Sequence, residues 1–250
     1  MRNAVVKAFS FALLLGTLAS CQKEFSIEGF LPNTPGVPPT NPPTNPPTNP
    51  PTNPPGNQTD CDLCEYFPMC DGSTYTYVDN MMGMQNTRNV TVDYLGDTTI
   101  NGVVFQKIVD GVNPQPAYFN CTNGATRVVS YNNVSTGGQN VSVADMVMLK
   151  ANEAVGATWT AVIDQAPTQQ AHYTFKILEK GISRTVAGTV YNDVIRVNQK
   201  MAAVIMGTST PLSDSDYYYA RDIGLIEVVI FNVMTGLQDG HTELQSYNIP

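Results

Sequence analysis

The stretch that decides the fold is His172-Tyr173-Thr174-Phe175-Lys176-Ile177-Leu178, in which apolar side chains occupy nearly every second position. Side chains of a β-strand point alternately to its two faces, so this period predicts a strand with one buried face. Three further stretches read in the same way, at residues 88–95, 191–197 and 224–231. No stretch shows three clean helical turns; the nearest, residues 141–155, contains β-branched residues and an alternating centre. We therefore expect a mainly β protein.

Turn signals separate these stretches. Asn101-Gly102 joins two short apolar runs and fits a type I′ hairpin, whose two central residues need positive φ. Lys180-Gly181, Gly137-Gly138 and Asp239-Gly240 are predicted to mark further reversals. We expect one antiparallel β domain over residues 60–250, built as a sandwich or as a curved open half-barrel. Its roughly 190 residues are enough for a sizeable core.

A proline-rich tract precedes this domain. Residues 32–56 contain 12 of the 18 prolines, and from Pro38 the chain repeats Pro-Pro-Thr-Asn. Proline fixes φ and lacks an amide proton, so a helix or a central strand is excluded and polyproline II remains. We predict that residues 21–59 form a disordered linker whose proline-rich part reaches roughly 75 Å, at about 3.1 Å per residue. It can serve as a stalk, as a neutral tether or as a proline-motif ligand.

The first residues have the order of an export signal. Arg2 and Lys7 flank an apolar run that is too short to span a bilayer, and Leu18-Ala19-Ser20-Cys21 follows. This order resembles the lipobox of bacterial lipoproteins. The resemblance implies that residues 1–20 are a signal peptide, that Cys21 is lipidated with acyl chains such as palmitate, and that the protein is anchored in the outer membrane. The alternative is an ordinary secretory signal with a chance cysteine.

Two further resemblances concern the cellular location of the protein and the fold of its domain. Gln22-Lys23-Glu24 is similar to the surface-export signal of lipoproteins from the Bacteroidota, which favours the cell surface over the periplasmic face. Residues 154–159, 185–197 and 217–226 are similar to segments of β-rich bacterial lipoproteins, a family without an established activity. The likeness implies a shared fold and no particular chemistry. We expect three residues in the core and a glycine at a bend or bulge: Trp159, Tyr191 and Ile226, and Gly224.

Charge excludes one class of partner. Removing residues 1–20 takes away two basic side chains and no acidic one, which leaves 11 basic and 21 acidic side chains and a formal charge of −10. A field of that sign repels phosphate backbones, so no nucleic-acid partner is expected. The chain also offers no basic patch for anionic headgroups, so attachment to the membrane must depend on the lipid at Cys21.

Four cysteines remain after Cys21: Cys61, Cys64, Cys70 and Cys121. An even number in an oxidising compartment favours two disulfides, for which three pairings are possible. The first three lie at the start of the domain, and a simple arrangement is that one bridge ties this segment to the loop around Cys121. The spacing of Cys61 and Cys64 also matches a redox motif, but a proline tract precedes it where that motif needs a strand. A four-cysteine zinc site is a further alternative, although only one close pair is present.

Other candidate chemistry is sparse. His172 and His241 are the only imidazoles, and neither stands near a nucleophile motif. Asp214 and Asp216 could share one strand face for acid–base chemistry or calcium binding, yet their surroundings read as a solvated, turn-rich loop. The three tyrosines at 217–219 must point to both faces of a strand, and outward ones could stack on sugar rings.

These observations predict a non-catalytic, lipid-anchored envelope protein that presents a disulfide-stapled β domain for binding or for a structural role. No catalytic residue, cofactor or metal is expected, and the ligand or protein partner is open. One alternative is a carrier whose curved sheet shelters an acyl chain or another apolar ligand, as in lipoprotein-carrier half-barrels. Another is a glycan-binding surface lipoprotein. A continuous apolar hollow would favour the carrier, and an exposed tyrosine platform would favour glycans.

Overall fold

The computed structural model describes residues 64–81, 83–110, 113–134, 140–166 and 169–250. The predicted signal peptide and linker lie outside the described residues. The strands are β1 (Thr74–Met81), β2 (Met84–Ile100), β3 (Val103–Asp110), β4 (Asn113–Thr122), β5 (Ala125–Val134), β6 (Asn140–Lys150), β7 (Thr158–Ala166), β8 (Gln169–Val186), β9 (Thr189–Ile205), β10 (Thr208–Ala220), β11 (Gly224–Phe231) and β12 (Gln238–Asn248). Over this part of the chain no helix is long and apolar enough to cross a membrane.

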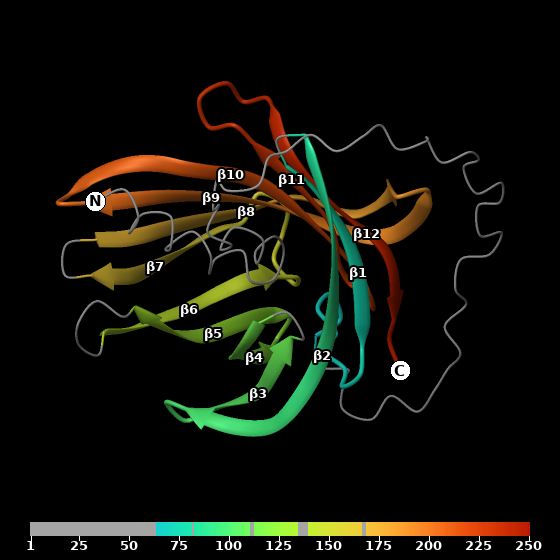
Figure 1. The fold of residues 1–250 in the computed structure, drawn as a ribbon, viewed down its shortest axis with the longest axis horizontal. Helices are drawn as coiled ribbons and strands as arrows, with labels where there is room; N and C mark the ends of the chain where they lie inside the picture. The colour runs from blue at the N-terminus through green and yellow to red at the C-terminus, as the bar shows by residue number, and fades with distance from the viewer. Residues whose placement is uncertain (1–63, 82, 111–112, 135–139, 167–168) are drawn as a thin grey trace, which may run out of the picture.

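All twelve strands belong to one antiparallel sheet in the order β6-β5-β4-β3-β2-β1-β12-β11-β10-β9-β8-β7. Among the described residues, strands that are neighbours in sequence pair with each other, except β6 and β7, and β1 also pairs with β12. Figure 1 shows β3–β6 and β7–β10 as two facing walls, joined on one side by β1, β2, β11 and β12. The sheet is therefore a nearly closed barrel. The predicted mainly β class and single antiparallel sheet are confirmed, in the curved form rather than as a sandwich.

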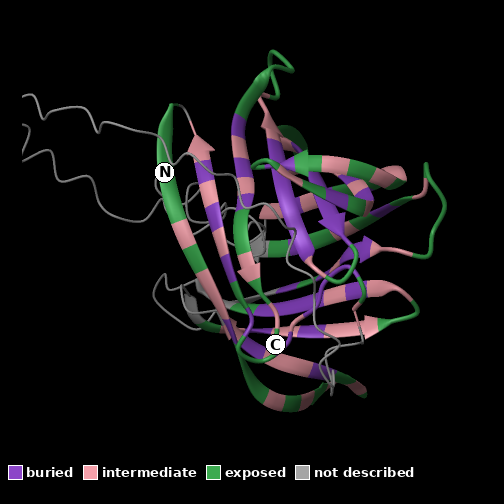
Figure 2. Ribbon diagram, turned by 90° about the vertical axis from the view of Figure 1, so that its right-hand side faces the viewer, coloured by how far each residue is buried: buried purple, intermediate pink, exposed green. Residues whose placement is uncertain are grey.

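The side chains that alternate between apolar and polar in the sequence alternate between buried and exposed in the structure. In β8, Tyr173, Phe175 and Ile177 are buried while Thr174 and Lys176 are exposed. Figure 2 shows the same banding along the other strands. Because every strand places one face inside the barrel, period two is the pattern that this fold requires.

The hairpin predicted at Asn101-Gly102 is confirmed, since it joins β2 to β3 with φ values of 51° and 79°. Two other predicted reversals are wrong. Gly181 lies within β8 at a break in register, so its positive φ serves a bulge rather than a turn. Gly240 lies within β12, where a Cβ would overlap the Met81 sulfur of the neighbouring strand, and the chain reverses instead at residues 232–237. Gly137-Gly138 lies outside the described residues.

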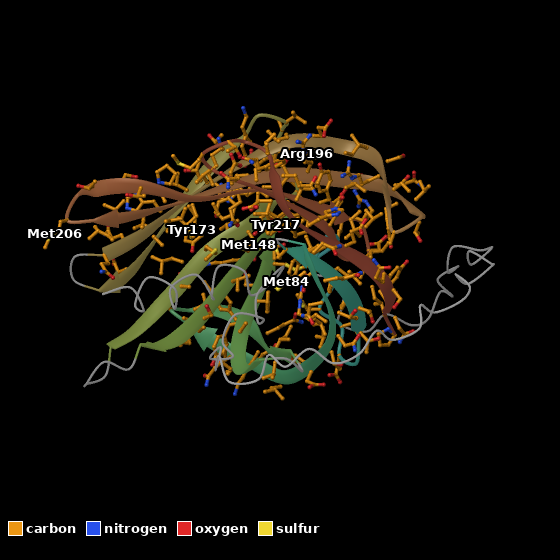
Figure 3. All side chains as sticks on the ribbon, turned by 45° about the horizontal axis from the view of Figure 1, so that its top comes forward. Met84, Met148, Tyr173, Arg196, Met206 and Tyr217 are labelled. Carbon is orange, nitrogen blue, oxygen red and sulfur yellow. A yellow bond between two sulfur atoms is a disulfide. The ribbon has the colours of Figure 1, made fainter. Side chains whose placement is uncertain are left out.

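Aromatic side chains fill much of the interior. Phe175 stacks on Trp159 with ring centroids 5.4 Å apart and lies 6.4 Å from Tyr173. Tyr217 stacks on Tyr219 at 6.3 Å. Figure 3 places Tyr173 and Tyr217 between the two walls. The residues expected in the core are buried, namely Trp159, Tyr191 and Ile226, and Gly224 has a φ of 102° where β11 begins.

The residues before β1 close one end of the barrel. We call Cys64–Ser73 the base segment. Its Phe67 is buried, with ring centroids 5.7 Å from Phe119 and 6.1 Å from Tyr219. The backbone NH of Asp222 donates to the Glu65 carbonyl at 2.6 Å. The base segment is thus part of the core.

A seam remains between β6 and β7, the two ends of the sheet order. In the described part of the chain these strands share no ladder, although they lie against each other. The Trp159 indole NH of β7 donates to the Val147 carbonyl of β6 at 2.7 Å. A side chain therefore supplies a hydrogen bond where strand pairing is missing.

Candidate ligand-binding cavity

A cavity lies inside the barrel, between the base segment and the wall formed by β1–β6. Its volume is about 90 Å³, within a wider hollow of about 980 Å³ that includes open solvent. The cavity is smaller than the 150 Å³ apolar cavity that holds benzene in another protein, so as it stands it admits only a small apolar group. An apolar cavity is the feature that would favour a carrier.

Most of the lining is apolar and comes from seven strands and the base segment. Phe67 and Met69 stand at the base, and Phe119 lines the wall beside them. The remaining apolar lining residues come from the base segment, from β1 to β6, and from β11 with the turn before it: Pro68, Tyr75, Tyr77, Val90, Val92, Ile108, Ala117, Val128, Ala144, Met146, Met148, Ile223 and Leu225. Figure 3 shows Met148 directed between the two walls. Methionine is unbranched and adapts to irregular shapes, so this wall can adjust to an occupant.

A buried ion pair adjoins the apolar lining. Arg88 Nε lies 3.3 Å from Asp79 Oδ2, and the side chains are 12 % and 8 % exposed. Thr242 donates from Oγ1 to Asp79 Oδ1 at 2.7 Å, and the Arg88 guanidinium lies 4.9 Å from the Tyr77 ring centroid. Arg88 also lines the cavity. The cavity wall therefore carries one fixed positive group, held in place by a carboxylate.

Ser130 supplies a second polar group. Its side chain lines the cavity opposite Ala144 in the β5–β6 ladder, and the residue is 1 % exposed. Its Oγ has no hydrogen-bond partner among the described residues. A buried unsatisfied hydroxyl costs about 1–3 kcal/mol, so a polar atom of an occupant would be stabilised here.

The lining tyrosines are neutral donors. Burial raises the pKa of Tyr75 and of Tyr77 far above the ordinary value. Tyr77 donates to the Leu225 carbonyl at 2.9 Å and Tyr75 to the Pro68 carbonyl at 3.2 Å. These hydroxyls are committed to the protein backbone, and the rings face the cavity as apolar surface.

One disulfide ties the start of the domain to the residues around Cys121, as expected. Cys64 is bonded to Cys121, with the Cα atoms 5.5 Å apart and a sequence separation of 57. Cys70 is buried and also belongs to a disulfide, while Cys61 lies outside the described residues. A loop of this length contributes about 4 kcal/mol in the chain-entropy estimate. Because Cys64 is bonded to Cys121, it is not bonded to Cys61, as a Cys61–Cys64 redox pair would require in its oxidised form. In the described part of the chain, no group of three or more metal-ligating side chains is present.

The prediction of a solvated loop around Asp214 and Asp216 is wrong. Both lie in β10, and Asp216 is buried and accepts from Arg196 Nη2 at 2.5 Å. Asn198 Nδ2 donates to both carboxylates, at 2.7 Å and 2.9 Å. Ser213–Asp216 continue the strand that Tyr217–Tyr219 form, although serine and aspartate are also common in turns. Their position directly before a predicted strand is the signal that could have placed them in it.

The tyrosine run likewise offers no exposed platform. Tyr217, Tyr218 and Tyr219 are all buried. Tyr218 points to the outer face, but the guanidinium groups of Arg184 and Arg196 cover its ring at 4.4 Å and 5.7 Å from the centroid. The predicted stacking surface for sugars is therefore absent at these residues.

An ionic cluster that no sequence pattern predicted lies on the same outer face. Glu227 is 3 % exposed and accepts from Arg184 at 2.5 Å and 2.9 Å and from His241 at 2.6 Å. Burial acts to raise the pKa of Glu227, but the hydrogen bonds from His241 and Arg184 outweigh it and leave the pKa below its ordinary value. The same hydrogen bond raises the pKa of His241. His172 lies elsewhere, beside Gln170 at 3.0 Å. The cluster joins Arg184 of β8 and His241 of β12 to Glu227 of β11. Its side chains therefore connect three strands on the outer face.

The comparisons with known proteins are sparse. No protein-family model and no curated protein matches the chain. Among solved structures, a candidate lipoprotein from Parabacteroides distasonis is similar with a TM-score of 0.46 and 12 % identity, over 76 % of this chain and 100 % of the other. A candidate exported protein with a YmcC-like fold from Bacteroides fragilis gives 0.44 and 11 %, over 74 % and 99 %. At these values the likeness carries no conclusion about activity.

Proposed function

We propose that this chain is a non-catalytic, lipid-anchored protein of the bacterial envelope whose barrel binds a small apolar ligand. The cavity between the base segment and β1–β6 is the observation that supports binding. Its lining is largely apolar and includes three polar residues, Arg88, Gln115 and Ser130. This composition suits a short acyl or other aliphatic segment with a polar end. Glycan binding is the weaker candidate, since Tyr217–Tyr219 are covered.

The lipid anchor at Cys21 is the part of the proposal that rests on the sequence. We expect cells fed an alkyne analogue of palmitate to label the parent chain, because the lipobox cysteine is the residue that is acylated in lipoproteins. Cys21→Ser should abolish labelling, and Ser26→Ala, five residues further on, should leave it unchanged. Continued labelling of the Cys21→Ser chain would show that the lipid is attached elsewhere.

Ligand binding is tested by filling the cavity. Ala144 is buried and lines it, so Ala144→Phe places a ring in the space that an occupant would use. We expect the parent protein to bind the apolar dye N-phenyl-1-naphthylamine and Ala144→Phe to bind it about tenfold more weakly or worse. Val162→Phe, on an exposed position of β7, is the matched control and should bind normally.

Two further measurements make this test decisive. Ser130→Ala removes the unsatisfied hydroxyl without adding volume, so it should raise thermal stability and keep dye binding even if Ala144→Phe folds poorly. Native mass spectrometry of protein purified from its own envelope should reveal a bound small molecule. Equal dye binding by the parent and a folded Ala144→Phe variant would contradict the proposal, and the barrel would then have a structural role.

A further inference from the structure

A row of three small side chains crosses the sheet at the cavity wall. Ser130 of β5 is paired with Ala117 of β4 on one side and with Ala144 of β6 on the other. All three residues line the cavity, and their exposed fractions are 1 %, 7 % and 1 %. Residues directly opposite each other in a ladder point to the same face of the sheet, so the three stand side by side. Because none of them is large, the row leaves space in front of it.

The same row gives the reason why the Ser130 hydroxyl is unsatisfied. Alanine has no polar side-chain atom, so neither cross-strand neighbour can donate a hydrogen bond to the hydroxyl or accept one from it. Strand pairing on both sides engages the main chain around Ser130. Among the described residues its Oγ accordingly has no partner. Since buried polar groups in native proteins are nearly always hydrogen-bonded, a ligand oxygen at this position would satisfy a group that the fold leaves open.

The charged group of the lining is already neutralised. Among the described lining residues Arg88 is the one charged side chain, and Asp79 pairs with it. Thr242 donates to the second carboxylate oxygen of Asp79, which fixes the pair in the wall. A ligand carboxylate would compete with Asp79 for the guanidinium or stay unpaired in apolar surroundings, and an ammonium group would be repelled by Arg88. Both arrangements cost free energy, so the lining disfavours a charged ligand.

We propose that the cavity selects a small uncharged molecule with one oxygen that hydrogen-bonds to Ser130, such as a short-chain alcohol or ketone. This inference rests on the proposed function, because it names the ligand class of the same cavity. The volume of about 90 Å³ limits the apolar part of the molecule to a few carbon atoms. The Tyr75 and Tyr77 hydroxyls donate to backbone carbonyls, whereas the Ser130 hydroxyl is unsatisfied. Ser130 is therefore the residue that determines specificity.

Methionine methyl groups can report binding in the full mature chain carrying Cys21→Ser, which lacks the predicted acyl anchor. Met146 and Met148 line the cavity, whereas Met206 and Met234 are 83 % and 89 % exposed and lie outside its lining. Figure 3 shows Met148 between the two walls and Met206 at the end of the β9–β10 hairpin. With ¹³C at the methionine methyl groups, a molecule in the cavity shifts the NMR signals of the first pair, and the exposed pair reports non-specific effects.

Three probes are titrated: xenon, which occupies apolar cavities without hydrogen bonding, and n-butanol and butyrate, which share a carbon skeleton and differ in charge. We expect xenon and n-butanol to bind the parent, and butyrate at neutral pH to bind about tenfold more weakly than n-butanol or worse. Ser130→Ala should weaken n-butanol binding about fivefold, as expected for one hydrogen bond, and leave xenon binding unchanged or slightly stronger. Ser215→Ala is the matched control, because Ser215 is also buried but lies outside the lining, and it should bind all three probes like the parent.

The outcomes separate this inference from the proposed function. Without a xenon shift at Met146 and Met148 the cavity is closed, and the proposed function fails together with the inference. If xenon binds, but n-butanol binds Ser130→Ala as tightly as the parent, the cavity is open and only the selection by Ser130 is wrong. Butyrate binding as tight as that of n-butanol would also overturn the inference, since a charged ligand would then be accepted. The thermal midpoint of Ser130→Ala, expected at or above that of the parent, shows that the variant is folded.

Discussion

Replacing Phe67 with alanine is expected to lower the free energy of unfolding by about 3–5 kcal/mol. Phe67 belongs to the base segment, which contributes no strand to the sheet, yet its ring is 3 % exposed and packs between Phe119 and Tyr219. Truncation removes those contacts and leaves a space that merges with the cavity it lines. The loss is therefore predicted at the upper end of core substitutions, although the residue lies close to the predicted linker.

Urea unfolding monitored by tyrosine and tryptophan fluorescence gives this change directly. The Cys64–Cys121 bond should be kept oxidised, because it tethers the segment in both folded and unfolded states and so confines the change to native packing. Val190→Ala, at an exposed turn position, is the control and should change stability by less than about 0.5 kcal/mol. A loss below about 1 kcal/mol for Phe67→Ala would mean that the base segment only rests on the barrel. In that case the linker would join a flexible end.

The sheet was readable from sequence because each strand must alternate, and residues 173–177 do so in their burial. Glycine was misread at two positions for a physical reason. Positive φ and a missing side chain serve a turn, a bulge or a close strand approach equally well, and only the neighbouring strand decides which. Gly181 is needed for a bulge and Gly240 for the approach of Met81, a residue 159 positions away in the chain.

The cavity was predictable only in outline. Its lining joins the base segment to seven strands, and no local pattern reports that side chains from such distant segments leave a space unfilled. Arg88 is the exception. It is in phase with Val90 and Val92 in the alternating stretch 88–95, so its inward orientation follows from the same period that predicts the strand. A charged residue on an apolar strand face is the signal that a search for a binding site could have used.

The base segment closes one end of the barrel, and Trp159 closes the seam between its two unpaired edges. A sheet that curls on itself must close both its open end and its unpaired edges, because unpaired strand edges recruit other chains. The base segment closes the end with aromatic packing and a disulfide. At the seam, β6 and β7 share no ladder in the described residues, and Trp159 connects them through its ring and its indole NH. The barrel is consequently expected to be weakest where one side chain replaces strand pairing.

Trp159→Ala is therefore expected to lower the free energy of unfolding by about 3–5 kcal/mol and to expose the facing edges of β6 and β7. The change removes the stack on Phe175, with centroids 5.4 Å apart, and leaves the Val147 carbonyl without its indole donor. Trp159→Phe separates the two contributions. It keeps an aromatic ring but loses the hydrogen bond, so about 1–3 kcal/mol should be lost.

Hydrogen exchange locates the effect. In Trp159→Phe, protection should fall in Ala144–Lys150 and Thr158–Ile163, the strand parts that flank the seam. The β10–β11 ladder, which is paired on both sides, should keep its protection. Tyr173→Phe is the matched control, because Tyr173 is also buried beside Phe175, and among the described residues no hydrogen bond from its side chain to β6 is present. If both variants reduce protection evenly over the whole sheet, the barrel unfolds as one unit. The seam would then have no separate role in its stability.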